Sequence, residues 1–365
     1  MAEPAAARLT IDLDAVAHNF QVLAAEAADA EAAPVVKADG YGLGAVAVAR
    51  RLWAEGARSF FVARIAEGEA LRAGLGRDRA ATIYVLDGFS GQAGARLDAA
   101  SLTPVLHSVP QIAAAAAWAA GSRRPLKVAL HVDTGMNRQG LTPEEALALA
   151  QGRSGFPSLD VDLVMSHLGS GTSPDDPRNP AQLTRFMEVR PEFPDARASL
   201  AASAGAFLGK AYRFDLIRPG ISLYGGGPFE QPDARLKSVA TLTAPILDIR
   251  HLRPGDIVGY GSSIRLDRPA RVAVVAAGYA DGVIRAAKAG GYGWLDDAKR
   301  PLLVVNMDLT VIDIGDADAA IGQPVELLGR HAQLDDLAAA AGTVAHEVLV
   351  RLSRRAERSY LGEID

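Results

Sequence analysis

Short apolar runs alternate with helical segments from about Arg8 to Tyr224 of the 365-residue chain. Each run is a few residues long, continuously apolar and rich in β-branched or aromatic side chains, which is typical of parallel strands buried on both faces. The runs lie at residues 35–36, 59–62, 82–86, 105–106, 127–132, 163–167 and 214–218. Segments such as 45–55, 65–73 and 110–120 lie between them and have helical length and composition. This alternation favours an α/β fold with an N-terminal (β/α)8 barrel, and a doubly wound parallel sheet is the alternative.

The pattern changes after the glycine-rich stretch 225–228. Segments 238–249, 256–259, 271–277, 302–313 and 324–328 are predicted to be strands separated by Gly, Pro and Asp turns, and a helix is expected at 334–341. We therefore expect two domains, a barrel over residues 8–230 and a β-rich domain over 231–365. The first few residues of the chain are a candidate addition to the second domain.

Composition excludes several classes of function. The net charge of −5 comes with no long basic run, so neither nucleic acid nor a membrane surface is indicated as a partner. The chain has no cysteine, which excludes disulfides, cysteine nucleophiles and zinc-thiolate sites, and we predict no metal site. The Ala-rich stretch 112–121 is too short to cross a bilayer, and residues 1–10 lack the basic and apolar regions of a signal peptide. We expect a cytoplasmic protein.

Lys37 ends an apolar run and is followed by Gly40, Gly42 and Gly44. A lysine at the mouth of a buried strand loses hydration, and burial disfavours its charged form. A desolvated amine is a nucleophile and a base, and it forms Schiff bases with carbonyl cofactors such as pyridoxal phosphate (PLP). The glycines allow the backbone to turn sharply and to approach a ligand closely. At this point a strand that ends in a solvated lysine before a turn is an equally good interpretation.

Other polar residues also end apolar runs, and in a barrel the active site lies at the C-terminal ends of the strands. Taken singly, each of them has a structural explanation, such as a hydrogen-bonded histidine or an arginine in a turn. Their common position at one end of the predicted strands favours a shared site. With Lys37, they are His131, Asp133, Arg138, His167, Ser203 and Arg218.

Two further features suggest chemistry. The Ser203 hydroxyl and the backbone amides of residues 218–222 are suited to an anion such as a phosphate. Tyr260 lies between two glycines, where it is either a turn residue or a base, and a base would need a nearby cation to lose its phenolic proton.

Together these motifs resemble the alanine racemase family, PLP-dependent enzymes built from a (β/α)8 barrel and a β domain. The resemblance covers nearly the whole chain, and its motifs occur in the family's order. They are VVKADGYGLG at 35–44, DTGMNRQG at 133–140, SHL at 166–168, RPGISLYG at 218–225, GYG at 259–261, GYADG at 278–282 and MD at 307–308.

The resemblance implies a role for each matched residue. Lys37 holds PLP and acts as the base on one face of the substrate α-carbon, and Tyr260 of the partner subunit acts on the other. Arg218 faces the pyridine nitrogen, and His167 connects Arg218 with the tyrosine. The phosphate is bound by Tyr41, Ser203, Gly220 and Ile221, while Arg138, the Met307 backbone and Tyr279 act on the substrate side.

The reaction implied is the interconversion of L-alanine and D-alanine in a homodimer with shared sites, which supplies D-alanine for peptidoglycan. Three positions depart from the family pattern. His131 stands where many members have a carbamylated lysine, Arg354 replaces a tyrosine on the phosphate side, and Asn306 replaces a frequent cysteine.

Three alternatives remain at the level of sequence. A racemase for serine or a broader range of small amino acids fits the same motifs. A non-catalytic PLP-binding homeostasis protein shares the lysine strand but lacks a β domain, and barrel-type amino-acid decarboxylases depend on a cysteine that this chain does not have.

Overall fold

The structure is a computed structural model that describes residues 6–76, 78–121, 125–152, 157–262 and 264–364. The chain forms two compact units. One, here called the barrel unit, comprises Asn19–Gly40, Gly44–Leu223 and Ile364–Asp365. The other, the β-rich unit, comprises Met1–His18, Tyr41–Leu43 and Tyr224–Glu363.

The barrel unit contains a ring of parallel strands. Its strands are β2 (Glu31–Ala32), β3 (Ser59–Val62), β4 (Thr82–Val85), β5 (Leu102–Leu106), β6 (Leu126–His131), β7 (Leu159–Met165), β8 (Arg197–Ser199) and β9 (Leu216–Ile217). Strands β3 to β8 are neighbours in chain order, and β2 pairs with β9. Bridges from Val35 to Phe61 and from Ala202 to Arg218 join these two sets and close the ring. The predicted (β/α)8 barrel is thus confirmed.

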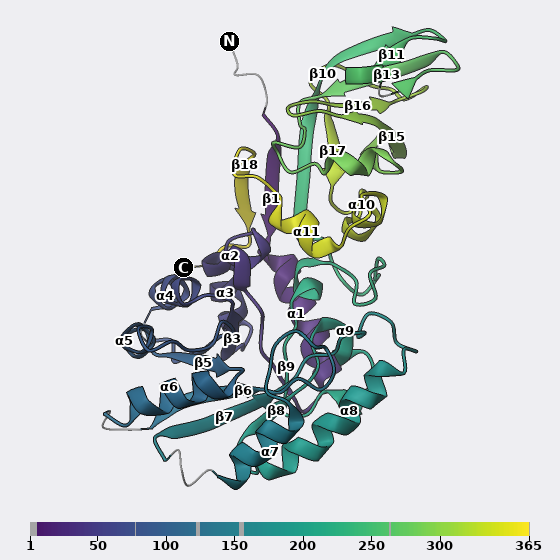
Figure 1. The fold of residues 1–365 in the computed structure, drawn as a ribbon. Helices are drawn as coiled ribbons and strands as arrows, with labels where there is room; N and C mark the ends of the chain where they lie inside the picture. The colour runs from purple at the N-terminus through teal and green to yellow at the C-terminus, as the bar shows by residue number, and fades with distance from the viewer. Residues whose placement is uncertain (1–5, 77, 122–124, 153–156, 263, 365) are drawn as a thin grey trace. The chain divides into compact units, whose positions relative to one another are not determined.

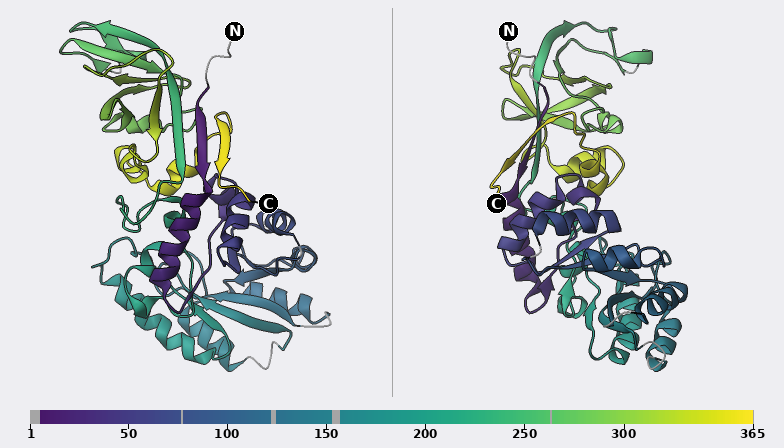
Figure 2. Two further views of the ribbon diagram at one scale, coloured as in Figure 1. Left: turned by 180° about the vertical axis from the view of Figure 1, so that it is seen from behind. Right: turned by 90° about the vertical axis from the view of Figure 1, so that its left-hand side faces the viewer.

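Helices lie on the outside of these strands (Figures 1 and 2). They are α1 (Leu13–Ala27), α3 (Ala45–Ala54), α4 (Ile65–Leu75), α5 (Gly94–Ala99), α6 (Val109–Ala119), α7 (Pro143–Gln151), α8 (Arg178–Val189) and the short α9 (Ser203–Ala206). In α8, Gln182, Phe186 and Val189 are buried, a spacing that places them on one face of the helix. Helix α7 begins at a capping box in which Thr142 and Glu145 satisfy each other's backbone N–H groups.

Apolar side chains from successive strands fill the centre of the barrel. This cluster consists of Ala33, Phe61, Tyr84, Val105, Ala129, Leu163, Met165 and Leu216. Because helices cover the outer face and this cluster covers the inner face, both faces of each strand are buried, which explains why the strands appear in the sequence as continuous apolar runs.

The β-rich unit is built on an eight-stranded sheet in the order β13-β16-β15-β14-β17-β10-β1-β18. Its strands are β1 (Arg8–Asp12), β10 (Ala240–Leu252), β13 (Ala270–Val275), β14 (Tyr292–Leu295), β15 (Ala298–Val305), β16 (Thr310–Asp313), β17 (Pro324–Leu328) and β18 (Glu357–Leu361). Strands β11 (Ile257–Val258) and β12 (Ile264–Arg265) form a separate hairpin, and helices α10 (Leu334–Ala340) and α11 (Ala345–Val350) follow β17. The long strand β10 runs beside β1 in both views of Figure 2.

The prediction of one strand over 302–313 is wrong. The segment forms the antiparallel strands β15 and β16, joined by a tight turn in which the Asn306 N–H donates to the Leu309 carbonyl at 2.8 Å. The turn sequence, Asn-Met-Asp-Leu, contains two turn-forming residues, Asn306 and Asp308, and this signal was overlooked because apolar residues flank it on both sides.

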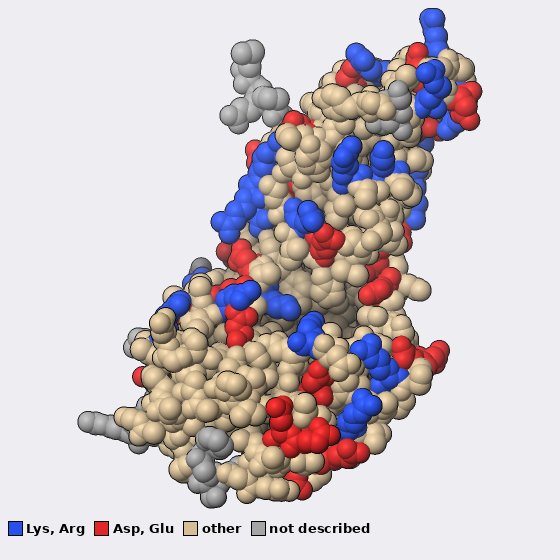
Figure 3. Space-filling model, in the orientation of Figure 1, with Lys and Arg blue, Asp and Glu red and all other residues tan. Residues whose placement is uncertain are grey.

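The surface carries charges of both signs. On the face drawn in Figure 3, Lys and Arg side chains are interspersed with Asp and Glu, and acidic side chains gather over α7, whose first turn holds Glu144 and Glu145. Within the ranges that the structure describes, no helix has the length and apolar character needed to cross a membrane.

Candidate active site

Lys37 begins a turn of left-handed backbone at the end of the β2 segment. Ala38, Asp39, Gly40 and Tyr41 all have φ between 53° and 63°. Left-handed backbone costs about 1–2 kcal/mol at each residue that carries a Cβ, so neighbouring groups must hold this turn in place. The Gly40 N–H donates to the Val36 carbonyl at 2.9 Å, and the Asp39 carboxylate accepts from the Ala45 N–H at 3.0 Å, at the start of α3.

The Lys37 amine lies in a partly buried and electropositive environment. Burial, followed by the charge of Arg138, lowers the pKa of Lys37, and the carboxylate of Glu67 opposes this shift. A larger fraction of the amine is therefore neutral near pH 7 than for an exposed lysine, which is the form that acts as a nucleophile or a base.

Arg218 follows β9 and is 3% exposed. Its guanidinium donates to the Ser199 hydroxyl and to the Ser166 carbonyl, both at 2.5 Å, and to the Leu200 carbonyl at 3.4 Å. Burial lowers the pKa of Arg218 to about 9, so the group still carries its charge at pH 7. The ends of β7 and β8 thus hold a fixed positive charge at the mouth of the barrel.

Two histidines next to Arg218 are held in the neutral form. Burial, with Arg218 as the next cause, lowers the pKa of His131 to about 3 and lowers the pKa of His167 well below its ordinary value. His131 is the last residue of β6 and is 8% exposed, while His167 follows β7 and is partly buried. His131, one of the three departures from the family pattern, therefore places a neutral imidazole at the end of β6.

Ser203 and the segment after Arg218 form a cradle of the kind that binds phosphate. The Ser203 hydroxyl accepts from the Gly220 N–H at 2.9 Å and from the Ser222 N–H at 3.3 Å, which leaves its own proton available to a ligand. Ser222 is fully buried, and its hydroxyl is one of four buried side-chain polar atoms without a hydrogen-bond partner in the described residues. Because such a group is costly unless something pairs with it, this orphaned hydroxyl fits an anionic ligand beside Ile221.

The loop after β6 is shaped by Asp133. Burial alone would raise the pKa of this carboxyl, but backbone N–H groups of the loop lower it on balance, and those of Gly135 and Met136 donate to its Oδ1 at 2.8 Å. The loop then presents Arg138, an exposed residue whose charge acts on Lys37 and His167. The predicted residues of the barrel unit therefore lie together at the C-terminal ends of the strands.

Sequence reasoning did not find Gln182, which is 0% exposed on α8. Its amide donates to the His167 carbonyl at 2.9 Å and to the Thr134 hydroxyl at 3.3 Å, and it accepts from the Gly169 N–H at 2.7 Å. One side chain thus links the loops after β6 and β7. A glutamine within a helix carries no distinctive sequence signal, and only its burial reveals this role.

The β-rich unit carries the remaining predicted residues. Tyr260 is 82% exposed, Met307 is 53% exposed and Tyr279 is 43% exposed. The Tyr279 N–H donates to the Asn306 carbonyl at 2.9 Å, which fixes the GYADG segment against the β15–β16 turn. Arg355, next to the exposed Arg354, binds both carboxylate oxygens of Asp281 and one of Asp308.

Tyr41 is buried within the β-rich unit. Its ring lies 4.6 Å from that of Tyr224 and 5.7 Å from that of His346, measured between centroids. Burial raises the pKa of Tyr41, so its hydroxyl remains protonated and can donate a hydrogen bond.

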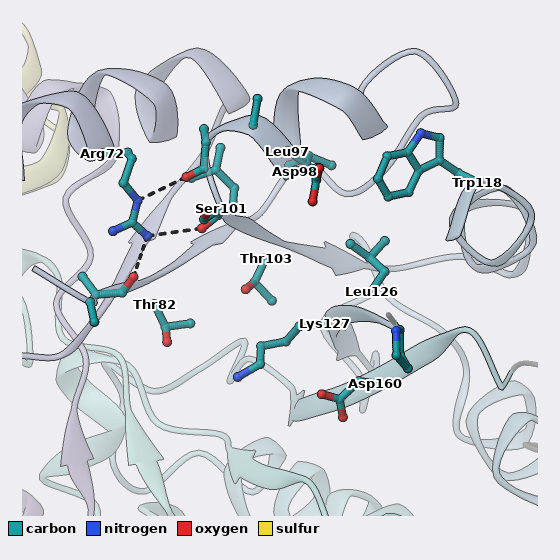
Figure 4. A pocket seen from close by; sticks show the side chains of 16 residues that line it. Arg72, Thr82, Leu97, Asp98, Ser101, Thr103, Trp118, Leu126, Lys127 and Asp160 are labelled. Carbon is teal, nitrogen blue, oxygen red and sulfur yellow. Dashed lines mark hydrogen bonds between the residues drawn. The ribbon is translucent and has the colours of Figure 1, made fainter. Parts of the chain in front are cut away.

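A pocket of about 780 Å³ with a mixed polar and apolar lining lies elsewhere in the barrel unit and does not include the predicted residues (Figure 4). It is lined by the first residues of β4, β5 and β6, the opposite ends of the strands from Lys37. Arg72 on its wall donates to the backbone carbonyls of Ala81, Ala100 and Ser101. In a barrel this end contributes to stability, not catalysis, and the pocket is not the catalytic centre.

The fold and the site together define a class of enzyme. A barrel that presents a partly buried lysine, a phosphate cradle and a buried arginine at the C-terminal ends of its strands is suited to PLP. Among the described residues, no group of three or more His, Asp or Glu could hold a metal ion.

Comparison with known proteins identifies the family. Residues 11–228 match the model of the alanine racemase N-terminal domain, and residues 239–360 match that of the C-terminal domain. The chain belongs to the alanine racemase family, whose members are PLP-dependent isomerases.

Similar sequences and structures agree with this assignment. The alanine racemase of Rhizobium meliloti is 42% identical, over 98% of this chain and 97% of the relative. In Agrobacterium fabrum, a biosynthetic enzyme is 42% identical over 98% and 95% of the two chains, and a catabolic one is 39% identical over 98% and 92%. The structure of alanine racemase from Bartonella henselae with covalently bound pyridoxal phosphate has a TM-score of 0.91 and 34% identity, and covers 98% of this chain and 100% of the other.

Proposed function

We propose that this chain racemises alanine by a two-base mechanism in which Lys37 and Tyr260 act on opposite faces of the α-carbon. The observation that carries the proposal is the joint placement of Lys37, Arg218 and the Ser203–Gly220 cradle at one end of the barrel strands. Racemisation needs one group to remove the α-proton and a second group to return it from the far side, which a lysine and a tyrosine can do.

Within the barrel unit, each residue has a defined task. The cofactor, when bound, supplies an electron sink for the charge that develops at the α-carbon. Lys37 would hold it, and the Ser203 hydroxyl, positioned by the Gly220 N–H, would bind its phosphate together with the Ile221 amide. Tyr41 of the β-rich unit would supply a further donor. Arg218 keeps its proton, so it would donate a hydrogen bond to the ring nitrogen of the cofactor, and its positive charge would disfavour protonation of that nitrogen. An unprotonated ring would withdraw electrons less strongly. The proton would then return to the α-carbon of the substrate and not to a carbon of the cofactor, which would limit transamination.

His167 and Arg138 complete the site. The neutral ring of His167 connects Arg218 with the tyrosine, and Arg138 positions the substrate carboxylate. Arg138 can donate two parallel hydrogen bonds to a carboxylate, which fixes the orientation of the α-carbon between the two bases.

The second base comes from a partner subunit, so we propose a homodimer with shared sites. Tyr260 is 82% exposed on its own chain, where a second copy can reach it. Met307 and Tyr279, also exposed, then contribute to the substrate side, with Tyr279 restricting entry to small side chains. Cytoplasmic location stays a prediction. Supply of D-alanine for peptidoglycan also stays a prediction, because both a biosynthetic and a catabolic alanine racemase of Agrobacterium fabrum resemble the chain. The named relatives give no support to serine as the substrate.

The test follows the α-hydrogen of alanine in deuterated water. The holoenzyme should convert L-alanine to α-deuterated D-alanine, and absence of deuterium at the α-carbon would overturn the proposal. Lys37→Ala should abolish both the reaction and the visible absorbance of the bound cofactor. Tyr260→Phe should keep that absorbance and still exchange deuterium into one enantiomer, but without inversion. The controls Lys210→Ala and Tyr212→Phe alter side chains on η3 (Lys210–Tyr212), which is not part of the site.

Mixing the two inactive variants tests the shared site. If Tyr260 of the partner subunit completes the site, a Lys37→Ala chain and a Tyr260→Phe chain together contain one intact site per mixed dimer. Because random assortment makes half of the dimers mixed, about a quarter of wild-type activity should return after denaturation and refolding of an equimolar mixture. Full inactivity of a mixture whose dimers are shown to be mixed would mean that both bases come from one chain.

A further inference from the structure

Glu67 on α4 forms hydrogen bonds that a helix cap does not require. As the third residue of the helix, it caps in the ordinary way, with Oε2 accepting from the Arg64 N–H at 3.2 Å. The same oxygen also accepts from the Ala63 N–H at 2.7 Å, at the end of β3. Its other oxygen, Oε1, accepts from the Ala38 N–H at 2.9 Å, on a different strand segment.

The bond to Ala38 holds the backbone where it leaves Lys37. Ala38 is the first residue of the left-handed turn, with φ of 53°, a conformation that alanine does not favour. A carboxylate that accepts from a backbone N–H makes a charge-assisted hydrogen bond, which is about twice as strong as a neutral one. Glu67 therefore joins the residue after Lys37 to the end of the neighbouring strand.

Glu67 also places a negative charge near the amine. The groups that act on Lys37 are Glu67 from α4 and Arg138 from the loop after β6, and Lys37 in turn acts on His167 at the end of β7. Of these, only Glu67 is an acid, and it counteracts the effect of burial and of Arg138.

We propose that Glu67 is a positioning residue for Lys37, which fixes the backbone turn that follows the lysine and balances the positive charge around its amine. The proposal deepens the proposed function, because it concerns the lysine that holds the cofactor. In addition to capping α4, Glu67 then links the backbone after Lys37 to the end of β3 through the N–H groups of Ala38 and Ala63.

The test uses the apoprotein, so its outcome does not depend on racemase activity. Glu67→Gln keeps the length of the side chain but removes its charge. The matched control is Glu145→Gln, which changes the equivalent glutamate of the α7 capping box, where Oε2 accepts from the Thr142 N–H at 2.9 Å. Both substitutions should reduce helix capping, and only the first should reach Lys37.

Two measurements distinguish the proposal from a purely structural cap. Hydrogen exchange at the Ala38 amide should become about tenfold faster in Glu67→Gln, as expected for the loss of a charge-assisted hydrogen bond, and should not change in Glu145→Gln. The pH profile of Lys37 labelling by trinitrobenzenesulfonate, followed by peptide mass spectrometry, should shift to lower pH only in Glu67→Gln.

Glu67→Asp separates the two parts of the task, because it keeps the charge on a side chain one methylene shorter. It should leave the labelling profile closer to that of the wild type than Glu67→Gln does, while Ala38 exchange increases. If Glu67→Gln lowers the melting temperature as Glu145→Gln does but leaves both the Lys37 profile and Ala38 exchange unchanged, Glu67 is only a helix cap and the proposal is wrong. Failure of the racemase reaction would not change any of these readouts.

Discussion

Nη2 of Arg218 lies 3.4 Å from Nδ1 of His167. A guanidinium can only donate hydrogen bonds, so Nδ1 must present its lone pair, and in the neutral ring the proton then resides on Nε2. The lowered pKa of His167, caused by burial and by Arg218, agrees with a neutral ring. One buried arginine therefore sets both the charge and the tautomer of the histidine beside it, and leaves an N–H that can donate into the site.

Arg218→Lys should destabilise the apoprotein by roughly 2–4 kcal/mol, because a lysine cannot reach all the acceptors of the guanidinium and leaves the buried carbonyls of Ser166 and Leu200 without donors. Urea denaturation measures the free energy of unfolding. Arg250→Lys, in an exposed pair with Asp248, is the control and should change it by less than about 0.5 kcal/mol. An equal effect of the two substitutions would contradict the structural importance of Arg218.

His131 should make the stability depend on pH below its unfolded-state pKa of about 6.5. Its folded-state pKa is lowered to about 3 by burial, followed by Arg218, so between these values the unfolded chain binds a proton that the folded chain does not. Stability should therefore decrease as the pH falls from 6.5 to 5, by about 1.4 kcal/mol per pH unit from this histidine once its unfolded form is protonated.

The measurement is urea denaturation of the apoprotein at several pH values, which compares the wild type with His131→Asn. The variant should lose this part of the slope, whereas His251→Gln, on the exposed end of β10, controls for removal of a histidine. Parallel pH profiles for the wild type and His131→Asn would show that His131 is not held neutral in the folded state.

The barrel and most of the candidate site could be predicted because their signals are local. Lys37, Ser203 and Arg218 each follow a short apolar run, and the barrel places the ends of such runs together. The pairing of β1 with β18 could not be predicted in this way, because Arg8 and Glu357 are separated by 349 positions and no local pattern connects them.

Glu67 and Gln182 escaped prediction for a different reason. Both are good helix formers within helices, where such residues usually face solvent, so their sequence context gives no indication of the backbone groups they bind. The glycines after Lys37 indicated a sharp turn, but the left-handed backbone of Ala38 was missed, because alanine disfavours that conformation and tertiary contacts impose it.

The left-handed turn predicts opposite effects of two substitutions. Ala38→Gly should stabilise the protein by roughly 0.5–1 kcal/mol, because relief of the left-handed strain exceeds the entropic cost of glycine. Gly40→Ala should destabilise it by about 1 kcal/mol for the reverse reason. The control is Ala66→Gly, the same replacement of alanine by glycine at an exposed position of helix α4. It should lower the free energy of unfolding by about 1 kcal/mol. Thermal denaturation of the apoprotein gives the sign of each effect, and a loss of stability in Ala38→Gly would contradict the strained turn.

Gln182→Leu should destabilise the barrel unit by roughly 2–4 kcal/mol, because it retains the apolar stem but leaves the Gly169 N–H and the His167 carbonyl without their partner. Thr184→Ala, at an exposed position on the same helix where the hydroxyl donates to the Pro180 carbonyl, should cost less than about 1 kcal/mol.

Urea denaturation gives both values. Hydrogen exchange of the Gly169 amide locates the effect, since this N–H should lose protection in Gln182→Leu but not in Thr184→Ala. A Gln182→Leu protein of full stability with a protected Gly169 amide would show that the loops after β6 and β7 are held by other contacts. If the amide is the link between these loops, cofactor affinity should fall in Gln182→Leu as well, because Arg218 donates to Ser166 in one of them.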